Sequence, residues 1–276
     1  MPVNRCWLSA FVLLASLLGF FPEPAAAAGA RYSIAIAPTL PATEIKRRWQ
    51  PLLDQLQRDT GFVLKFHFYK DSIDFEEGLQ KSEPDFALID PLQLWKVRTR
   101  YLPIVRDAAP IVGMILVRKD SPLQSLADLN KHTLATAGGN DMASLMLYTQ
   151  TFKSIRIQPR LHVHRTHSNG LRAVILGKLD AAISNSAYLQ LMPVGLAQQM
   201  RTIHQTSPMT GQAFAVARRI PADDLHKMKA ALLHLKESHA ELLPIAQMPN
   251  IIEADLERDY SFFANLIAAE TSDVAN

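Results

Sequence analysis

Asp85-Phe86-Ala87-Leu88-Ile89-Asp90-Pro91 is the stretch that indicates the fold most clearly. The residues between its two aspartates are all apolar, which is typical of a short strand buried on both faces of a parallel sheet. Asp90 suits the N-cap of a helix and Pro91 suits its first turn, so a helix is predicted to follow at once. A buried strand that leads directly into a helix predicts an α/β protein.

The same alternation of short apolar segments and amphipathic stretches continues on both sides of this segment. Further strands are expected at 32–37, 62–69, 111–117, 134–137, 161–164, 179–184 and 212–217. Further helices are expected near 49–60, 75–79, 125–128, 141–148, 169–176, 222–239 and 253–269. Near Ile203 the chain is expected to turn back towards the first part of the molecule. We therefore expect mixed, mostly parallel sheets flanked by helices.

The first 28 residues are typical of a secretory signal. Arg5 is followed by an uncharged apolar run of 15 residues at 7–21, and the small residues 26–28 suit a cleavage site. A retained membrane anchor is the alternative, but such a helix needs about 20 apolar residues. The sequence therefore predicts export to the periplasm and cleavage near Ala28.

The composition restricts the remaining function classes. Cys6, the only cysteine, lies inside the predicted signal, so the mature chain is expected to fold without disulfides. The net charge is +3, and the longest basic run is Lys46-Arg47-Arg48. A small, dispersed positive charge does not favour nucleic acid as a partner.

Several segments, in this order and spacing, resemble the phosphate/phosphite/phosphonate-binding family of periplasmic substrate-binding proteins of ABC importers. The resemblance extends from about Ile34 to Leu233. It rests on Trp49-Gln50-Pro51-Leu52-Leu53 with Thr60-Gly61, on the Asp85-to-Pro91 stretch, on 115–121 with 125–129, on Gly177-Lys178-Leu179-Asp180-Ala181-Ala182, and on Ser207-Pro208.

The resemblance implies a type II periplasmic-binding fold with a ligand cleft between two lobes. The first lobe would comprise 29–112 plus 208–276, and the second, 113–207, would be inserted into it. The implied function is to capture a small solute, as a monomer without a cofactor, and to deliver it to an ABC permease in the inner membrane. Reporting of the ligand to a membrane sensor kinase is the alternative.

The resemblance also implies which residues contact the ligand. The expected ligand residues follow strand ends or begin helices, where unpaired N–H groups are available. They are Thr39 after Pro38, Asp90, Pro91, Gly138, Gly139, Asn140, Asp141, Met142, Ala143, Ser168, Asn169, Asn185, Ser186 and Thr210. The alternative interpretation of Gly138 to Asp141 is a tight turn followed by an aspartate N-cap.

The chain departs from the family at two of these places. The helix after the ligand loop usually begins with Ser-Thr-Ser in the family, and here the matching residues are Asp141, Met142 and Ala143. Asp90 also stands where the family usually has glycine. Two carboxylates would repel an anion, so phosphonate, phosphite and phosphate are predicted to be poor ligands. A neutral, zwitterionic or cationic solute is expected, unless Asp141 only caps its helix and a basic residue neutralises the site.

Two further classes of function find less support in the sequence. His162, His164 and His167 could bind zinc or copper, or they could simply lie on a sheet edge and a loop. No Gly-x-Ser-x-Gly motif, P-loop or His-Glu-x-x-His motif is present. The chain is therefore predicted to be neither an enzyme nor a metal-binding protein, with a metal-binding protein or a hydrolase as the remaining alternatives.

Overall fold

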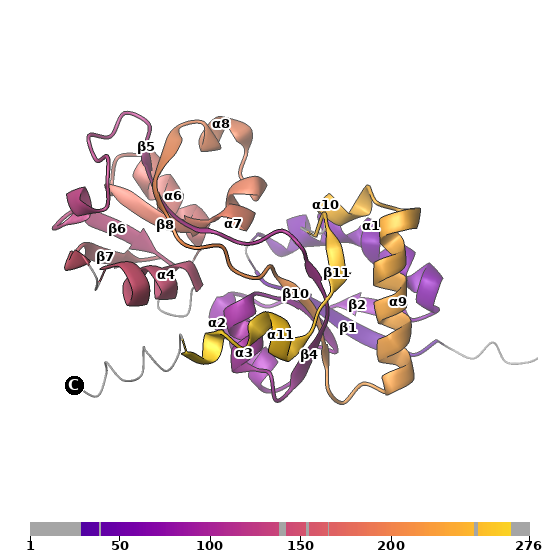
Figure 1. Cartoon of the computed structure of the whole chain (residues 1–276). Coiled ribbons are helices and arrows are strands. Elements are labelled where there is room, and N and C mark those ends of the chain that lie inside the picture. Colours follow the sequence, from indigo (N-terminus) through magenta and orange to yellow (C-terminus); the bar gives the residue numbers. More distant parts are fainter. Residues whose placement is uncertain are drawn as a thin grey trace, which may run out of the picture.

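The chain forms two lobes, each built on its own β-sheet, in a computed structural model (Figure 1). The structure describes residues 29–38, 40–137, 142–152, 155–164, 166–245 and 248–265. The two sheets contain six and five of the described strands. No helix in these ranges is long and apolar enough to cross a membrane.

The first sheet combines strands from both ends of the described chain, in the order β11-β4-β10-β3-β1-β2. These strands are β1 (Arg31–Ile36), β2 (Val63–Phe66), β3 (Phe86–Ile89), β4 (Tyr101–Asp107), β10 (Ala213–Ala217) and β11 (Ile251–Glu253). One face packs on α1 (Ala42–Thr60), α9 (Ala222–Ser238) and α10 (Leu242–Ile245). The other face packs on α2 (Ser72–Gln80), α3 (Pro91–Lys96) and α11 (Leu256–Tyr260).

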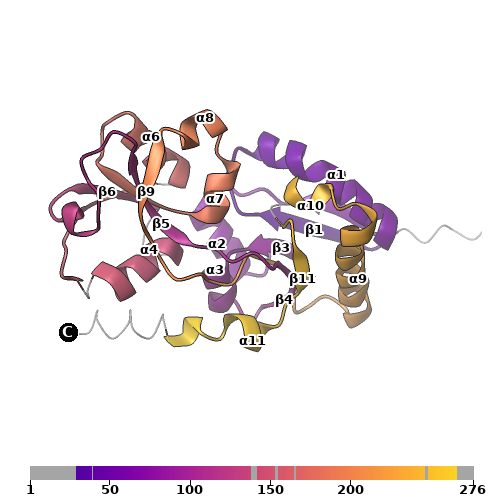
Figure 2. The ribbon, with the colours of Figure 1, turned by 45° about the horizontal axis from the view of Figure 1, so that its top comes forward.

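The second sheet uses only the middle of the chain, in the order β7-β6-β8-β5-β9. Its strands are β5 (Gly113–Arg118), β6 (Thr133–Thr136), β7 (Arg160–Val163), β8 (Ala181–Asn185) and β9 (Met200–Gln205). The helical elements of this lobe are η1 (Ala127–Leu129), α4 (Met142–Met146), η2 (Leu147–Phe152), α6 (His167–Ile175), α7 (Ser186–Leu191) and α8 (Val194–Ala197). Figure 2 shows this lobe beside the first one, with α7 turned towards α1 and α10.

Side-chain alternation along the central strands explains why both faces of the first sheet are covered. Ile34 and Ile36 of β1 are buried in the cluster that contains α1 and α9. Ala35, between them, is buried in the cluster that contains α2 and α3. Successive side chains on a strand point to opposite faces, so a strand with apolar residues on both faces needs helices on both sides.

The sheets are more mixed than the sequence predicted. Among the described strands four pairings are parallel and five are antiparallel, so the expectation of mostly parallel strands is wrong. The antiparallel neighbours β4 and β10 continue into the two segments that cross between the lobes, as do β5 and β9. One crossing leaves the first lobe and the other returns to it, so the strands that feed them must run in opposite directions.

The two crossing segments, 107–112 and 206–212, connect the lobes, and we call them the hinge. They are joined at an isolated antiparallel bridge between Ile111 and Met209. Ile111 N–H donates to the Met209 carbonyl at 2.9 Å, and Met209 N–H donates to the Ile111 carbonyl at 2.8 Å. Both side chains are buried together with Met146 of α4, so the hinge also packs against the second lobe.

Two boundaries differ from the sequence predictions. The return towards the first lobe near Ile203 is as predicted, because β9 runs antiparallel to β5 and leads into the second crossing segment. The strand expected at 62–69, however, ends at Phe66. The helix expected from Glu253 is also wrong at its start: Ile251–Glu253 is strand β11, paired with β4, and a short helix begins only at Leu256. Its expected end at Ala269 lies outside the described residues.

Candidate functional site

The carboxyl ends of β3 and β8 both lie beside the hinge. Ile89, the last residue of β3, pairs with Ala213 directly after the second crossing segment. Asn185, the last residue of β8, pairs with Gly113 directly after the first. The two sheets therefore present equivalent strand ends to the boundary between the lobes, which is where α/β proteins bind ligands.

Asp90 and Pro91 begin α3 as the sequence predicts. The Asp90 side chain accepts the Gln93 N–H at 2.9 Å, and Pro91 has no N–H to donate. Leu92 is fully buried. The start of α3 thus has few N–H groups free for an anion and carries a carboxylate instead.

Asn185 and Ser186 begin α7 and attach it to the hinge. The Asn185 side chain accepts the Tyr188 N–H at 2.9 Å, as an N-cap. Ser186 N–H donates to the Val112 carbonyl at 2.9 Å, and Val112 N–H donates to Ser186 Oγ at 3.0 Å. A change in the position of α7 therefore acts directly on the first crossing segment.

The remaining predicted ligand residues lie in different surroundings. Ser168 and Asn169 are in the first turn of α6, where Thr166 Oγ1 accepts the Asn169 N–H at 3.2 Å. Thr210 lies in the second crossing segment and donates its hydroxyl to the Asp259 carbonyl at 2.7 Å. Met142 begins α4, and Ala143 is fully buried in the core of the second lobe. Thr39, Gly138, Gly139, Asn140 and Asp141 lie outside the described residues.

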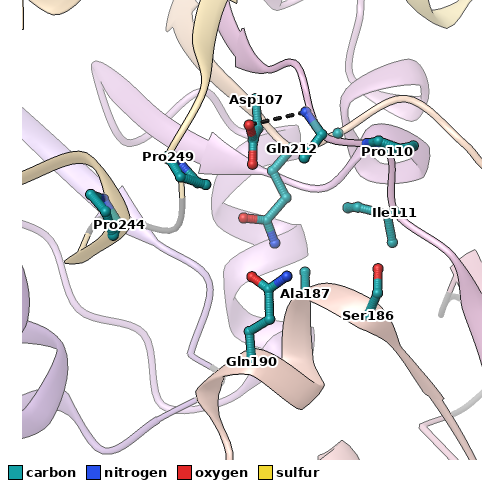
Figure 3. Close-up of a pocket in the computed structure, with 11 residues that line it drawn as sticks. Asp107, Pro110, Ile111, Ser186, Ala187, Gln190, Gln212, Pro244 and Pro249 are labelled. Atoms are coloured by element: carbon teal, nitrogen blue, oxygen red, sulfur yellow. Dashed lines mark hydrogen bonds between the residues drawn. The ribbon is translucent and has the colours of Figure 1, made fainter. Parts of the chain in front are cut away.

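A cavity of about 240 Å³ lies at the hinge, and we call it the hinge pocket (Figure 3). Both crossing segments, α7 of the second lobe and two prolines of the first lobe line it. The lining residues are Asp107, Ala109, Pro110, Ile111, Ser186, Ala187, Gln190, Gly211, Gln212, Pro244 and Pro249. Of the predicted ligand residues that the structure describes, only Ser186 is among them.

Asp107 is the only charged residue among the described residues of that lining. Its side chain is buried, and Oδ1 accepts the N–H groups of Ala109 and Asn250 at 3.1 and 3.3 Å. The side chains of Gln212 and Gln190 approach each other across the pocket from opposite lobes (Figure 3). Sequence reasoning missed these three residues, because each has ordinary neighbours in the chain and only the tertiary fold brings them together.

The hinge is also tied to α11 by a network around Asp259. Arg106 Nε lies 3.1 Å and Arg258 Nη2 2.8 Å from Asp259 Oδ2. Burial opposes ionisation of this carboxyl, but hydrogen bonds from Arg258, from the Asp255 N–H and from Arg106 outweigh it and lower its pKa to about 2. Asp259 is therefore a charged structural link between β4 and α11.

The three histidines of the metal hypothesis are spread over a strand and a helix start. His162 is exposed on β7, and His167 Nδ1 lies 3.3 Å from the Ile183 carbonyl oxygen. Within the described part of the chain, no three His, Cys, Asp or Glu side chains are grouped closely enough to hold a metal ion.

Two α/β lobes, joined by two crossing segments with a pocket at their hinge, define the class of two-lobed binding proteins. Residues 34–260 match the family model described as "ABC transporter, phosphonate, periplasmic substrate-binding protein". The chain belongs to this family, whose members are periplasmic solute-binding components of ABC transporters rather than enzymes. A comparison with curated protein sequences finds no match.

Solved structures show the same fold at low sequence identity. The binding-protein component of an ABC phosphonate transporter from Pseudomonas aeruginosa is similar with a TM-score of 0.76 and 18% identity, covering 90% of this chain and 89% of that one. PhnD1 from Prochlorococcus marinus, in complex with methylphosphonate, gives a TM-score of 0.74 and 14% identity over 86% and 96%. The periplasmic VFT2 domain of Bordetella pertussis BvgS gives 0.55 and 18% over 78% and 91%.

Proposed function

We propose that this chain is an exported protein that captures a small solute between its lobes and delivers it to an ABC importer in the inner membrane. The observation that supports this most is the hinge, because the Ile111–Met209 bridge and the pocket beside it lie where both lobes meet. A protein that closes over a solute needs such a joint, and closure can be recognised by a membrane partner.

The N-terminal sequence pattern supports the proposal that the protein is exported. Arg5, the apolar run 7–21 and the small residues 26–28 are those of a cleaved secretory signal. In this proposal the mature protein begins near Gly29 and works in the periplasm as a monomer. Its lobes comprise 29–112 with 208–276, and 113–207.

The proposed solute is neutral, zwitterionic or cationic rather than a phosphonate. Asp90 places a carboxylate at the start of α3, and Pro91 removes an N–H that an anion could use. Asp141 adds a second carboxylate to the sequence at the place where the family has a serine. Two unit charges about 5 Å apart repel by roughly 3 kcal/mol at an effective dielectric of 20, which exceeds the attraction of a helix N-terminus.

A panel of solutes with matched anions tests both parts of the proposal. The cognate solute is expected to reduce the radius of gyration in small-angle scattering and to raise the thermal midpoint. At 100 times its Kd a ligand adds about 2.7 kcal/mol to the free energy of unfolding. Methylphosphonate, phosphite and phosphate are expected to produce neither change.

Variants and controls test the proposed solute class and the proposed closure of the lobes separately. Asp141→Ser should make the protein more responsive to methylphosphonate, whereas Asp120→Ser, at an exposed site on the second lobe, should not. A clear shift of the unmodified protein with methylphosphonate would contradict the proposed solute class. A saturating solute that leaves the radius unchanged would contradict closure.

A further inference from the structure

The hinge pocket combines one carboxylate with a wall that is partly apolar. The described residues of its lining include no lysine, arginine or histidine. Prolines, alanines and an isoleucine form most of the wall, while Asp107, Gln190, Gln212 and Ser186 supply the polar side chains. None of the described lining residues has an aromatic ring, so they form no aromatic cage of the kind that binds quaternary ammonium groups.

The Asp107 carboxylate is buried without a cationic partner among the described residues. Asp107 as a whole residue is 8% exposed. Oδ1 accepts two backbone N–H groups, and no described side chain forms an ion pair or hydrogen bond with Oδ2. Neighbouring Arg106 pairs with the Asp259 carboxylate, and its Nη1 donates to the backbone carbonyl of Asp107 at 3.1 Å rather than to the Asp107 carboxylate. A buried charge is costly unless it is paired, so this carboxylate favours a cation that enters from solvent.

Amide groups provide the remaining acceptors. Gln212 Oε1 is buried and has no hydrogen-bond partner among the described residues. The Gln190 amide approaches Gln212 from α7 on the opposite side of the pocket (Figure 3). An ammonium group has three N–H donors and no acceptor, which matches one carboxylate oxygen and two amide oxygens.

The size of the pocket limits the rest of the ligand. A cavity of about 240 Å³ is near the lower end of ligand pockets, which measure about 300–1,000 Å³. A short alkyl chain fits in this space against Pro110, Ile111 and Ala187.

We propose that the hinge pocket binds a small primary alkylammonium group, with Asp107 as the counter-charge and Gln212 and Gln190 as additional acceptors. The inference refines the proposed function, on which it rests, by naming the charged group of the solute. Since Gln190 belongs to the second lobe and Asp107 to the hinge, occupancy of the pocket joins the two.

Titration with n-butylamine, which is the butylammonium ion at neutral pH, tests the charge requirement. Its binding is measured by calorimetry and by thermal shift, beside 1-butanol and butyrate at the same concentrations. Butylammonium is expected to bind and stabilise the protein, 1-butanol to bind at least tenfold more weakly, and butyrate not to bind. Equal binding of butylammonium and 1-butanol, or no binding of butylammonium, would overturn the proposal.

Asp107→Asn is the central variant, because asparagine keeps an oxygen for the N–H groups of Ala109 and Asn250 but removes the charge. Loss of a charged hydrogen bond is expected to weaken butylammonium binding about tenfold or more. Asp120→Asn removes a charge of the same type from an exposed site and should leave binding unchanged. If Asp107→Asn does not fold, Gln212→Leu serves instead and should weaken binding severalfold.

The outcomes distinguish this inference from the function on which it rests. If a solute closes the lobes and binds equally well to the protein and to Asp107→Asn, the pocket proposal is wrong and the transport function stands. If butylammonium binding requires Asp107 but no solute closes the lobes, the pocket proposal stands and the proposed function is wrong.

Discussion

Asp85 in the first lobe and Asp180 in the second make the same three hydrogen bonds. Asp85 Oδ2 accepts the N–H and the hydroxyl of Ser33 at 2.7 and 2.8 Å, and its own N–H donates to Ser33 Oγ at 3.0 Å. Asp180 Oδ2 accepts the N–H and the hydroxyl of Thr133 at 2.8 and 2.7 Å, and its N–H donates to Thr133 Oγ1 at 2.8 Å. We call each arrangement a strand clasp, since it joins β1 to β3 in one lobe and β6 to β8 in the other.

The lobes differ at the carboxyl ends of β3 and β8, the strands that follow the two aspartates. Five residues after each aspartate comes an N-cap, Asp90 in the first lobe and Asn185 in the second. The side chain of each cap accepts the N–H of the third residue beyond it at 2.9 Å. The two caps therefore have the same hydrogen-bond geometry, but Asp90 is a carboxylate and Asn185 is a neutral amide. The strand clasp links neighbouring strands in both lobes, whereas the two caps lie at strand ends beside the hinge.

Removal of the clasps should have the largest effect on stability, and an unequal one. The Asp85 side chain is 19% exposed and also lies 2.6 Å from Arg219 Nη2, whereas Asp180 is 41% exposed, 3.3 Å from His132 Nδ1. We expect Asp85→Ala to lower the free energy of unfolding by about 3–4 kcal/mol and Asp180→Ala by about 1–2 kcal/mol, because buried charged hydrogen bonds contribute more than exposed ones. Urea denaturation measures the difference.

Amide hydrogen exchange locates each effect. Protection should fall in β1 and β3 for Asp85→Ala and in β6 and β8 for Asp180→Ala. The exposed Asp120→Ala should cost less than about 0.5 kcal/mol. Equal losses for the two clasp variants would show that burial does not distinguish them.

Acid should weaken the clasp of the second lobe. Burial opposes ionisation of Asp180, but hydrogen bonds from Thr133 and from His132 outweigh it and lower the pKa of this carboxyl. A carboxyl whose pKa is lower in the folded state stabilises the fold fully above its unfolded value of about 3.9, and this contribution is lost as the pH falls through the folded pKa. Between about pH 5 and 3, Asp180→Asn should therefore lose less stability than the unmodified protein. Parallel acid-unfolding curves would contradict this linkage.

Exchange of the caps should have the smallest effect on stability. Asparagine and aspartate are similarly good N-caps, so Asp90→Asn and Asn185→Asp are each expected to change the free energy of unfolding by less than about 1 kcal/mol. The exchanges should instead change which ligand charge the protein accepts. Asp90→Asn should increase the thermal shift with methylphosphonate, and Asn185→Asp should not. A large loss of stability in either variant would show that the cap itself holds the strand end.

Local signals in the sequence predicted the elements that local chemistry determines. The apolar β3 with its Asp90 cap lies where its sequence indicates, and Gly61 and Gly177 end their helices at φ values of 69° and 70°. Strand β4 was missed because it contains Pro103, which normally argues against an inner strand. The structure accommodates this proline where the register between β4 and β10 shifts. Phe214 of β10 pairs with Val105, but the next residue, Ala215, pairs with Pro103.

The candidate site depended on long-range contacts and was therefore less predictable. The helix starts at Asp90 and Asn185 follow from short motifs, whereas the hinge pocket joins Asp107 to Gln190 and Gln212 through the pairing of distant strands. No periodicity or motif marks these residues. The strand termini were predicted from the sequence, but the cavity beside them was not.

The bridge between Ile111 and Met209 has a mechanical consequence. Two polypeptide segments linked by a pair of hydrogen bonds form a short ribbon rather than two independent connections. Such a ribbon resists sliding of one segment along the other but bends easily out of its own plane. We therefore expect the relative motion of the lobes to follow a single rotational axis, so that one angle describes every intermediate between the open and the shut protein.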